Sequence, residues 1–311
     1  PGGQGYAWTS RPDGIVKRII FTHGKNPKPP ALEHEQQLLR CLLHGVHKVD
    51  SEVAAEIESS DCFSLVSWSH LFYDTVLDIA DVLPWIDRLL AEADPPADLR
   101  AARPLKYRAA KAMYTVGDYL PWLIPLIPDP RVKRSICETN AYFSNHDNSA
   151  CHIRQLQKEP LRAAAARGDR VLLIGHSMGS VIAYDSLWEL QYLEGVGDCV
   201  DCLLTLGSPL GMNYVQRRLR GRDAGHLGHY PCNINRWVNI SSRGDLVALD
   251  PSLANDFRAM TASGCVTEIQ DMRNDIMNHY RDDRGLNVHK SYGYLVNPHV
   301  AQVIADWWRD A

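Results

Sequence analysis

Long hydrophobic runs and charge of a single sign are both missing from this sequence. No stretch is apolar over the ~20 residues that a membrane-spanning helix needs, so no integral membrane segment is expected. The 33 Lys and Arg nearly balance the 37 Asp and Glu, for a formal net charge of -4. This balance gives no reason to expect nucleic acid or an anionic membrane as a partner. Internal repeats and low-complexity tracts are absent too.

The sequence also lacks the signatures of metal and nucleotide sites. His-Glu-x-x-His does not occur, and His44-x-x-His47 has no nearby carboxylate arranged to complete a metal site. A phosphate loop of the Gly-x-x-x-x-Gly-Lys type and a dinucleotide fingerprint are missing as well. The sequence therefore predicts neither a cofactor nor a metal.

Cysteine is present but follows no recognisable framework. The eight positions are Cys41, Cys62, Cys137, Cys151, Cys199, Cys202, Cys232 and Cys265. A chain of this length can fold without a disulfide framework, and Cys199-x-x-Cys202 lacks the second pair that a structural zinc site would need. Because unbonded cysteine packs as a small apolar side chain, we expect Cys199 and Cys202 to be buried thiols.

The composition is that of a globular domain, with 45% hydrophobic and 23% charged residues. The 311 residues can bury a large core and fit one α/β domain over residues 15–311. Residues 1–14, rich in glycine and polar side chains, are expected to form an irregular lead-in. A cytoplasmic location is favoured, and secretion stays open because the sequence starts at Pro1 rather than Met.

Segments typical of strands alternate with helical segments along the chain. Ile15–Phe21 and Cys62–Trp68 have the apolar content of strands, and Ala31–Gly45 between them has helical periodicity. Later strands are expected at Asp201–Leu206, Arg236–Ile240 and, as the last one, Cys265–Ile269. This alternation predicts an α/β fold with a mostly parallel central sheet flanked by helices.

Residues 71–149 interrupt that alternation. The region is too long for a single crossover, and it has helical character around Thr75–Glu92 and Leu99–Val116. Tyr119–Pro128 is apolar but broken by proline. Two interpretations stay open: a helical lid over a binding site, or a helical extension packed on the core.

The most specific motif in the chain is Gly175-His176-Ser177-Met178-Gly179. It follows the apolar segment Val171–Ile174, which reads as a buried strand, and precedes a segment with one apolar helical face. A serine on so sharp a turn has a strained backbone and an exposed hydroxyl, and a larger side chain at either glycine would collide across the turn. The helix N-terminus also favours a developing negative charge.

This strand–turn–helix segment resembles the nucleophile elbow of the α/β-hydrolase family, with Ser177 at the position of the nucleophile. The resemblance covers the chain from about Ile15 to the C-terminus. It implies an α/β-hydrolase fold in which residues of about 73–149 form an inserted helical cap. It also implies that an acid and then a histidine follow the serine in chain order, each in a loop after a strand.

Asp245 is the residue that best matches the acid of this family, because it follows a strand directly in a Gly-Asp turn. Asp250 and Asp223 are the alternatives. A turn-capping role for Asp245 also stays open, since aspartate often has that role.

His289 best matches the base, because it lies after the final expected strand and ahead of the closing helix. His279 is the alternative. His299 falls inside the closing helix, which Asn297 and Pro298 predict to begin there and to run to about Trp308.

Two backbone N–H groups should stabilise the oxyanion of the transition state. The resemblance assigns one to Met178 and the other to the loop His23-Gly24-Lys25, with Lys25 preferred and Gly24 as the alternative. His23 is expected to hold this loop by hydrogen bonding, and His176 to point away from the Ser177 hydroxyl. The side chain of Lys25 is expected to be solvated.

These assignments predict a serine hydrolase that cleaves an acyl bond, most simply a carboxylic ester, through an acyl-enzyme intermediate. Its partner would be a small-molecule or lipid-like ester, and the apolar run Tyr119–Pro128 favours a hydrophobic one. An acyltransferase or thioesterase on the same triad is the first alternative. A non-catalytic binding module on this fold is the second.

Overall fold

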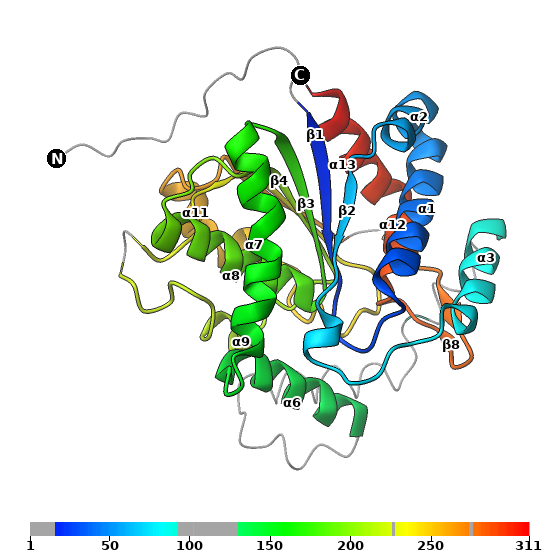
Figure 1. Ribbon diagram of the computed structural model, residues 1–311, viewed down its shortest axis with the longest axis horizontal. Helices are drawn as coiled ribbons and strands as arrows, with labels where there is room; N and C mark the ends of the chain where they lie inside the picture. Colours follow the sequence, from blue (N-terminus) through cyan, green and yellow to red (C-terminus); the bar gives the residue numbers. More distant parts are fainter. Residues whose placement is uncertain (1–15, 93–101, 103–129, 226–227, 274–275, 311) are drawn as a thin grey trace.

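The computed structural model describes residues 16–92, 102, 130–225, 228–273 and 276–310 (Figure 1). Its centre is a six-stranded sheet in the order β2-β1-β3-β4-β5-β6, and every neighbouring pair of strands is parallel. The strands are β1 Lys17–Thr22, β2 Phe63–Val66, β3 Arg170–His176, β4 Val200–Leu206, β5 Ile234–Ile240 and β6 Glu268–Met272. The predicted α/β architecture with a parallel sheet is confirmed.

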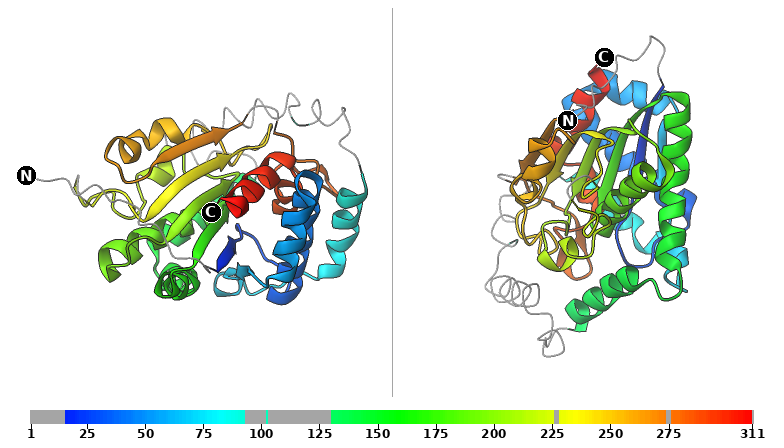
Figure 2. Two further views of the ribbon diagram at one scale, coloured as in Figure 1. Left: turned by 90° about the horizontal axis from the view of Figure 1, so that it is seen from above. Right: turned by 90° about the vertical axis from the view of Figure 1, so that its left-hand side faces the viewer.

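Helices cover both faces of the sheet, as the two views of Figure 2 show. One face carries α1 Ala31–Val49, α2 Ser51–Ser59, α3 Leu83–Ala91, α12 Ser291–Leu295 and α13 Pro298–Arg309. The other carries α7 Ser149–Arg167, α8 Met178–Glu194, α9 Asn213–Gln216, α10 Leu253–Asp256 and α11 Arg258–Ala262. A further helix, α6, spans Pro130–Ser144.

Successive side chains of a strand point to opposite faces of a sheet. Ile19 and Phe21 of β1 accordingly pack on the α1 side, and Ile20 packs on the α7 side. Burial on both faces explains why the central strands are apolar almost without interruption. Because all six strands are parallel, they end at one common edge of the sheet, where the loops after β1, β3, β4 and β5 meet.

Several predicted boundaries are wrong by a few residues. The first predicted helix continues past Gly45 to Val49 and is followed by α2, and β2 is shorter than predicted at both ends. The predicted last strand, Cys265–Ile269, is observed as β6 at Glu268–Met272, because its ladder begins where Glu268 pairs with Arg236. It is also not the last strand, since a short antiparallel hairpin follows, formed by β7 Arg281–Asp282 and β8 Gly285–Leu286.

The helical stretch predicted around Thr75–Glu92 is confirmed from Ile79 onward and wrong before it. Only the turn Ile79–Asp81 and α3 are helical, and α3 starts at Leu83 because Pro84 fits the first turn of a helix but not its interior. Leu99–Val116 and the apolar run Tyr119–Pro128 lie outside the described residues, apart from Ala102. Of the cap predicted at about 73–149, the described residues contain α3, α6 and the first residue of α7, so the cap stays a prediction.

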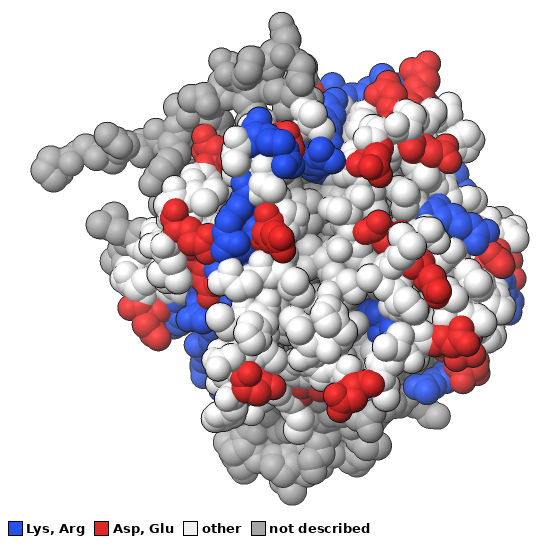
Figure 3. Space-filling view, viewed as in Figure 1, with Lys and Arg blue, Asp and Glu red and all other residues white. Residues whose placement is uncertain are grey.

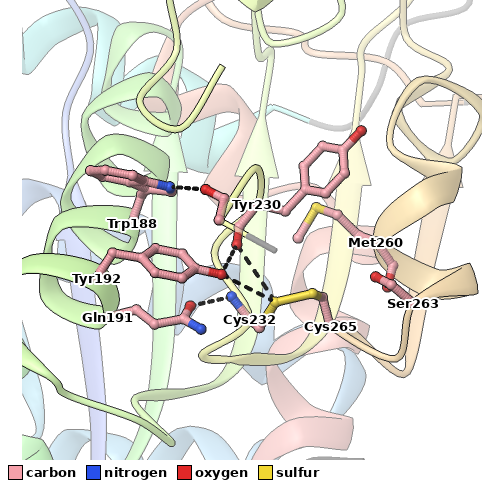
Figure 4. The surroundings of a disulfide bond; sticks show 9 residues. Trp188, Gln191, Tyr192, Tyr230, Cys232, Met260, Ser263 and Cys265 are labelled. Carbon is pink, nitrogen blue, oxygen red and sulfur yellow. Dashed lines mark hydrogen bonds between the residues drawn. A yellow bond between two sulfur atoms is a disulfide. The ribbon is translucent and has the colours of Figure 1, made fainter. Parts of the chain in front are cut away.

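A disulfide joins Cys232, just before β5, to Cys265, just before β6 (Figure 4). The spacing of the cysteines predicts no disulfide at these positions. Gln191 and Tyr192 of α8 support this corner, because Gln191 accepts a hydrogen bond from the Cys232 N–H and Tyr192 donates one to the Tyr230 carbonyl. Closing a loop of 33 residues stabilises a fold by about 3–4 kcal/mol in the chain-entropy account.

Cys199 and Cys202 are both buried thiols, as predicted. On the face that Figure 3 shows, acidic and basic side chains are interspersed along α7. Within the described ranges, every helix is too short or too polar to cross a bilayer.

Candidate active site

Ser177 lies on the sharp turn between β3 and α8, at the carboxyl edge of the sheet. Its φ of 54° lies in a region that residues other than glycine rarely adopt, and such strain is typical of functional sites. A Cβ on Gly175 would come within 2.7 Å of the Ser180 Cα, which confirms the predicted collision across the turn. A Cβ on Gly179 would instead meet β1, at 2.2 Å from the Thr22 carbonyl oxygen.

The structure brings together the three side chains that were predicted to form a triad. The His289 Nε2 lies 2.9 Å from the Ser177 Oγ, and the His289 Nδ1 lies 2.7 Å from the Asp245 Oδ2. A carboxylate can only accept, so the Nδ1–H of His289 donates to Asp245 and its Nε2 is left to accept from the Ser177 hydroxyl. In this tautomer His289 can take the serine proton while Asp245 stabilises the resulting imidazolium.

Asp245 is fully enclosed, and three donors surround its carboxylate. His289 and the Tyr294 hydroxyl both donate to Oδ2, each at 2.7 Å, and the Val247 N–H donates to Oδ1 at 2.9 Å. Burial alone would raise the pKa of Asp245, but the charge and hydrogen bond of His289, with the bonds from Tyr294 and Val247, lower it overall. Asp245 therefore stays ionised at neutral pH.

The alternative residues lie elsewhere. Asp250 is exposed and accepts from the Ser252 N–H, as a turn-capping aspartate does. Asp223 is exposed on a different cavity, beside Arg222. The imidazole bonded to Ser177 is that of His289 rather than His279, and His299 lies in α13, as predicted.

The two predicted oxyanion donors lie on either side of Ser177. Met178 is the first residue of α8, where backbone N–H groups have no acceptor inside the helix. Gly24 lies against Ser177 so closely that a Cβ would be 2.6 Å from the Ser177 Cβ. Lys25 follows Gly24, so its N–H belongs to the peptide that runs beside the serine.

His23 holds that peptide in place, as predicted for its side chain. Its Nε2 accepts from the Trp68 N–H at 3.1 Å, so its Nδ1–H donates to the Gly24 carbonyl at 2.8 Å. The carbonyl and the N–H of a trans peptide point in opposite directions. Fixing the Gly24 oxygen therefore also fixes the direction of the Lys25 N–H.

His176 and Tyr294 contribute to the site through contacts that the sequence does not predict. The Nε2–H of His176 donates to the His289 carbonyl at 2.7 Å, and burial holds the pKa of His176 well below its ordinary value, so the ring is neutral. Tyr294 accepts from the Ser242 N–H while it donates to Asp245. No periodicity or motif predicts either contact, because each joins segments that are distant in the sequence.

A cavity of about 220 Å³ opens beside Ser177 and His289. Leu77, Val82 and Val247 form its apolar part, and Lys25, Lys28 and Lys290 contribute ammonium-bearing side chains. The expectation that Lys25 is solvated is wrong, because its Nζ donates to the Thr139 Oγ1 at 2.8 Å and burial lowers its pKa to about 8.

Comparison with protein-family models, curated proteins and solved structures found no match to this chain. Over the part of the chain that the structure describes, no group of three His, Cys, Asp or Glu side chains could hold a metal ion. The arrangement around Ser177 is therefore interpreted on its own geometry.

Proposed function

We propose that this protein is a serine hydrolase of the α/β-hydrolase fold that cleaves a carboxylic ester through an acyl-enzyme intermediate. The observation that carries the proposal is the continuous hydrogen-bond chain Ser177–His289–Asp245, with distances of 2.9 and 2.7 Å. The strained backbone of Ser177 and its position at a helix N-terminus support the same conclusion.

In this mechanism His289 takes the proton from Ser177 as the Oγ attacks the ester carbonyl. The N–H groups of Met178 and of Lys25, or Gly24 in its place, stabilise the oxyanion. His289 then gives the proton to the departing alcohol, which leaves an acyl group on Ser177. Water repeats the sequence with His289 as base and releases the acid and the free serine.

Acyl transfer and thioester cleavage would use the same first half-reaction, and they differ only in the acceptor or in the leaving sulfur. Preference for a hydrophobic acyl chain stays a prediction from Tyr119–Pro128. A panel of 4-nitrophenyl esters from acetyl to palmitoyl tests it, and a preference for the shortest chains would contradict it.

The decisive experiment is labelling with a fluorophosphonate probe, which reacts with activated serines. The wild-type protein should be labelled, Ser177→Ala should lose labelling and turnover, and the exposed control Ser59→Ala should keep both. Labelling that persists in Ser177→Ala would contradict the proposal.

The base is tested separately. His289→Ala should lower kcat by roughly 10³-fold or more, because the members of such a triad act as one unit. Undiminished turnover in that variant, measured with 4-nitrophenyl butyrate, would move the base to another histidine such as His279.

A further inference from the structure

The cavity beside Ser177 has an unusual balance of charge. Three lysines contribute to its wall, Lys25, Lys28 and Lys290, and His34 lies among them. Among the described residues that line it, none is Asp or Glu. Pockets for small molecules are mostly apolar with a few convergent polar groups, so a wall with three lysines requires an explanation.

Lys290 follows His289 directly and is held in place by aromatic rings. Its Nζ lies 5.6 Å from the ring centre of Tyr280 and 5.8 Å from that of Tyr292, both within cation–π range. Over the described part of the chain, its ammonium makes no hydrogen bond and no ion pair within bonding distance. Cation–π contacts orient an ammonium group without using its N–H donors, so all three stay available to an acceptor.

Lys28 approaches the same space from the loop after β1. Its Nζ donates to the backbone carbonyls of Lys25 and Asn26, the latter at 3.0 Å, which leaves one N–H uncommitted. Burial, and next the charge of Lys290, hold the pKa of Lys28 well below its ordinary value, while Glu138 opposes the shift only in part. Burial likewise lowers the pKa of Lys290, with Asp282 opposing.

His34 completes the group. It is 1% exposed, and its Nδ1 has no hydrogen-bond partner in the described structure. A buried polar atom without a partner is rare in folded proteins. Two lysine side chains whose charged forms repel each other lie next to an unsatisfied imidazole. In such an environment a bound anion favours the charged form of both lysines and supplies the missing acceptors.

We propose that this cavity binds a carboxylate that the ester substrate carries in addition to the ester itself, with Lys28 and Lys290 as its ligands. The substrate would then be a monoester of a short dicarboxylic acid, and the methylene chain of the acid would lie against Leu77, Val82 and Val247. This inference rests on the proposed ester hydrolysis at Ser177 and specifies the substrate class of that site.

The test compares two esters that differ only at the end of the acyl chain, mono-4-nitrophenyl adipate and 4-nitrophenyl hexanoate. The wild-type protein should show kcat/KM at least about tenfold higher for the adipate ester, the usual effect of hydrogen bonds to a charged group. Lys290→Met and Lys28→Met should each bring the ratio of the two kcat/KM values close to one. Lys290→Arg should keep most of the preference.

Exposed Lys48, near the far end of α1, provides the matched control, and Lys48→Met should leave the ratio unchanged. A distorted loop would slow both esters equally, so the ratio separates lost binding from lost structure. Hydrolysis of both esters at equal rates by the wild-type protein, or an undiminished ratio in both lysine variants, overturns the inference alone. Absence of fluorophosphonate labelling and of all turnover instead contradicts the proposed hydrolysis.

A binding measurement tests the carboxylate site in a protein that shows no labelling and no turnover, because it needs no catalysis. Millimolar adipate should raise the Tm of Ser177→Ala, since a ligand that binds only the folded state stabilises it. The further exchange Lys290→Met should remove the shift. Inorganic phosphate serves as the second probe: a Tm rise with phosphate but none with adipate would overturn the carboxylate assignment.

Discussion

Asp245 shows at the scale of single residues how the site keeps a buried charge. Taking a carboxylate out of water is unfavourable unless hydrogen bonds replace its hydration. His289, Tyr294 and the Val247 N–H supply these bonds. The phenol of Tyr294 shares Oδ2 with His289, so it also restricts how the carboxylate can rotate against the imidazole.

Tyr294→Phe should therefore lower kcat about three- to tenfold, with little change in KM, because Asp245 keeps its charge but loses one of the donors that orient it. Steady-state kinetics with 4-nitrophenyl butyrate measures this effect. Tyr192→Phe, which removes a hydroxyl at the far end of α8, is the control and should leave kcat unaltered. Equal kcat for Tyr294→Phe and the wild type would show that this bond has no orienting role.

Sequence alone reached the three triad candidates by two different routes. Ser177 could be assigned locally, because its flanking glycines, strand and helix are contiguous. Asp245 and His289 could be chosen only from their chain order and their position after strands. Tyr294 and His176 were missed because a tyrosine in a short apolar helix and a histidine beside an elbow have many ordinary explanations, and only tertiary structure reveals their partners.

At the scale of elements, the site depends on α8 lying directly against β1. The contact occurs at Gly179, where a Cβ would be 2.2 Å from the Thr22 carbonyl oxygen and 2.8 Å from that of His23. The same close approach brings the loop after β1 alongside Ser177. The spacing between these two elements therefore determines the spacing between the serine and its expected oxyanion donors.

Gly179→Ala should destabilise the protein by about 1–3 kcal/mol, because backbone atoms must move to admit the methyl group. Turnover at Ser177 should fall as well, since the expected donors move with α8 and the β1 loop. Urea unfolding and the ester assay measure the two effects. Exposed Gly197, with no atom within 4 Å of an added Cβ, is the matched site. Gly197→Ala should be neutral or stabilising by up to ~1 kcal/mol, and an equal loss in both variants would contradict the packing argument.

The elements that sequence predicted best were the buried ones. β3, α8 and α13 are long and have clear apolar patterns or caps, and Asn297 accepts from the His299 N–H as its capping role requires. The predicted start of β6 was wrong because pairing with β5, rather than local propensity, determines where this strand begins. The β7–β8 hairpin that precedes His289 was missed because strands of two residues are too short to have a pattern.

At the scale of the whole molecule, buried charge links helices on the α7 side of the sheet. Glu189 of α8 accepts from Arg154 at 2.7 Å and from Lys158 at 2.8 Å, both on α7. Asp185, one turn earlier in α8, accepts from the Tyr142 hydroxyl of α6 and from the Arg220 N–H. Glu189 is matched by full positive charges, whereas the donors to Asp185 among the described residues, a phenol and a backbone N–H, are neutral.

This difference makes the stability of the fold depend on pH through Asp185. Burial raises its pKa from 3.8 to about 6, although the Arg220 N–H, the charge of Arg154 and the Tyr142 hydroxyl oppose the shift. Between these two values the folded state binds more protons than the unfolded state, so this contribution to stability falls as pH rises. The contribution is complete below about pH 4 and is lost above about pH 6, and its size is about 3 kcal/mol.

Asp185→Asn removes the titration while keeping a side chain that can bond to both Tyr142 and Arg220. Relative to the wild type, the Tm of this variant should therefore rise by roughly 5 °C between pH 4 and pH 7. Differential scanning calorimetry at both pH values measures the difference, in which groups common to the two proteins cancel. Exposed Asp198 provides the control, and Asp198→Asn should show the same Tm difference from the wild type at both pH values. A Tm difference for Asp185→Asn that stays constant or falls with pH would mean that the carboxylate is charged in the folded state throughout this range, and that Arg154 outweighs burial.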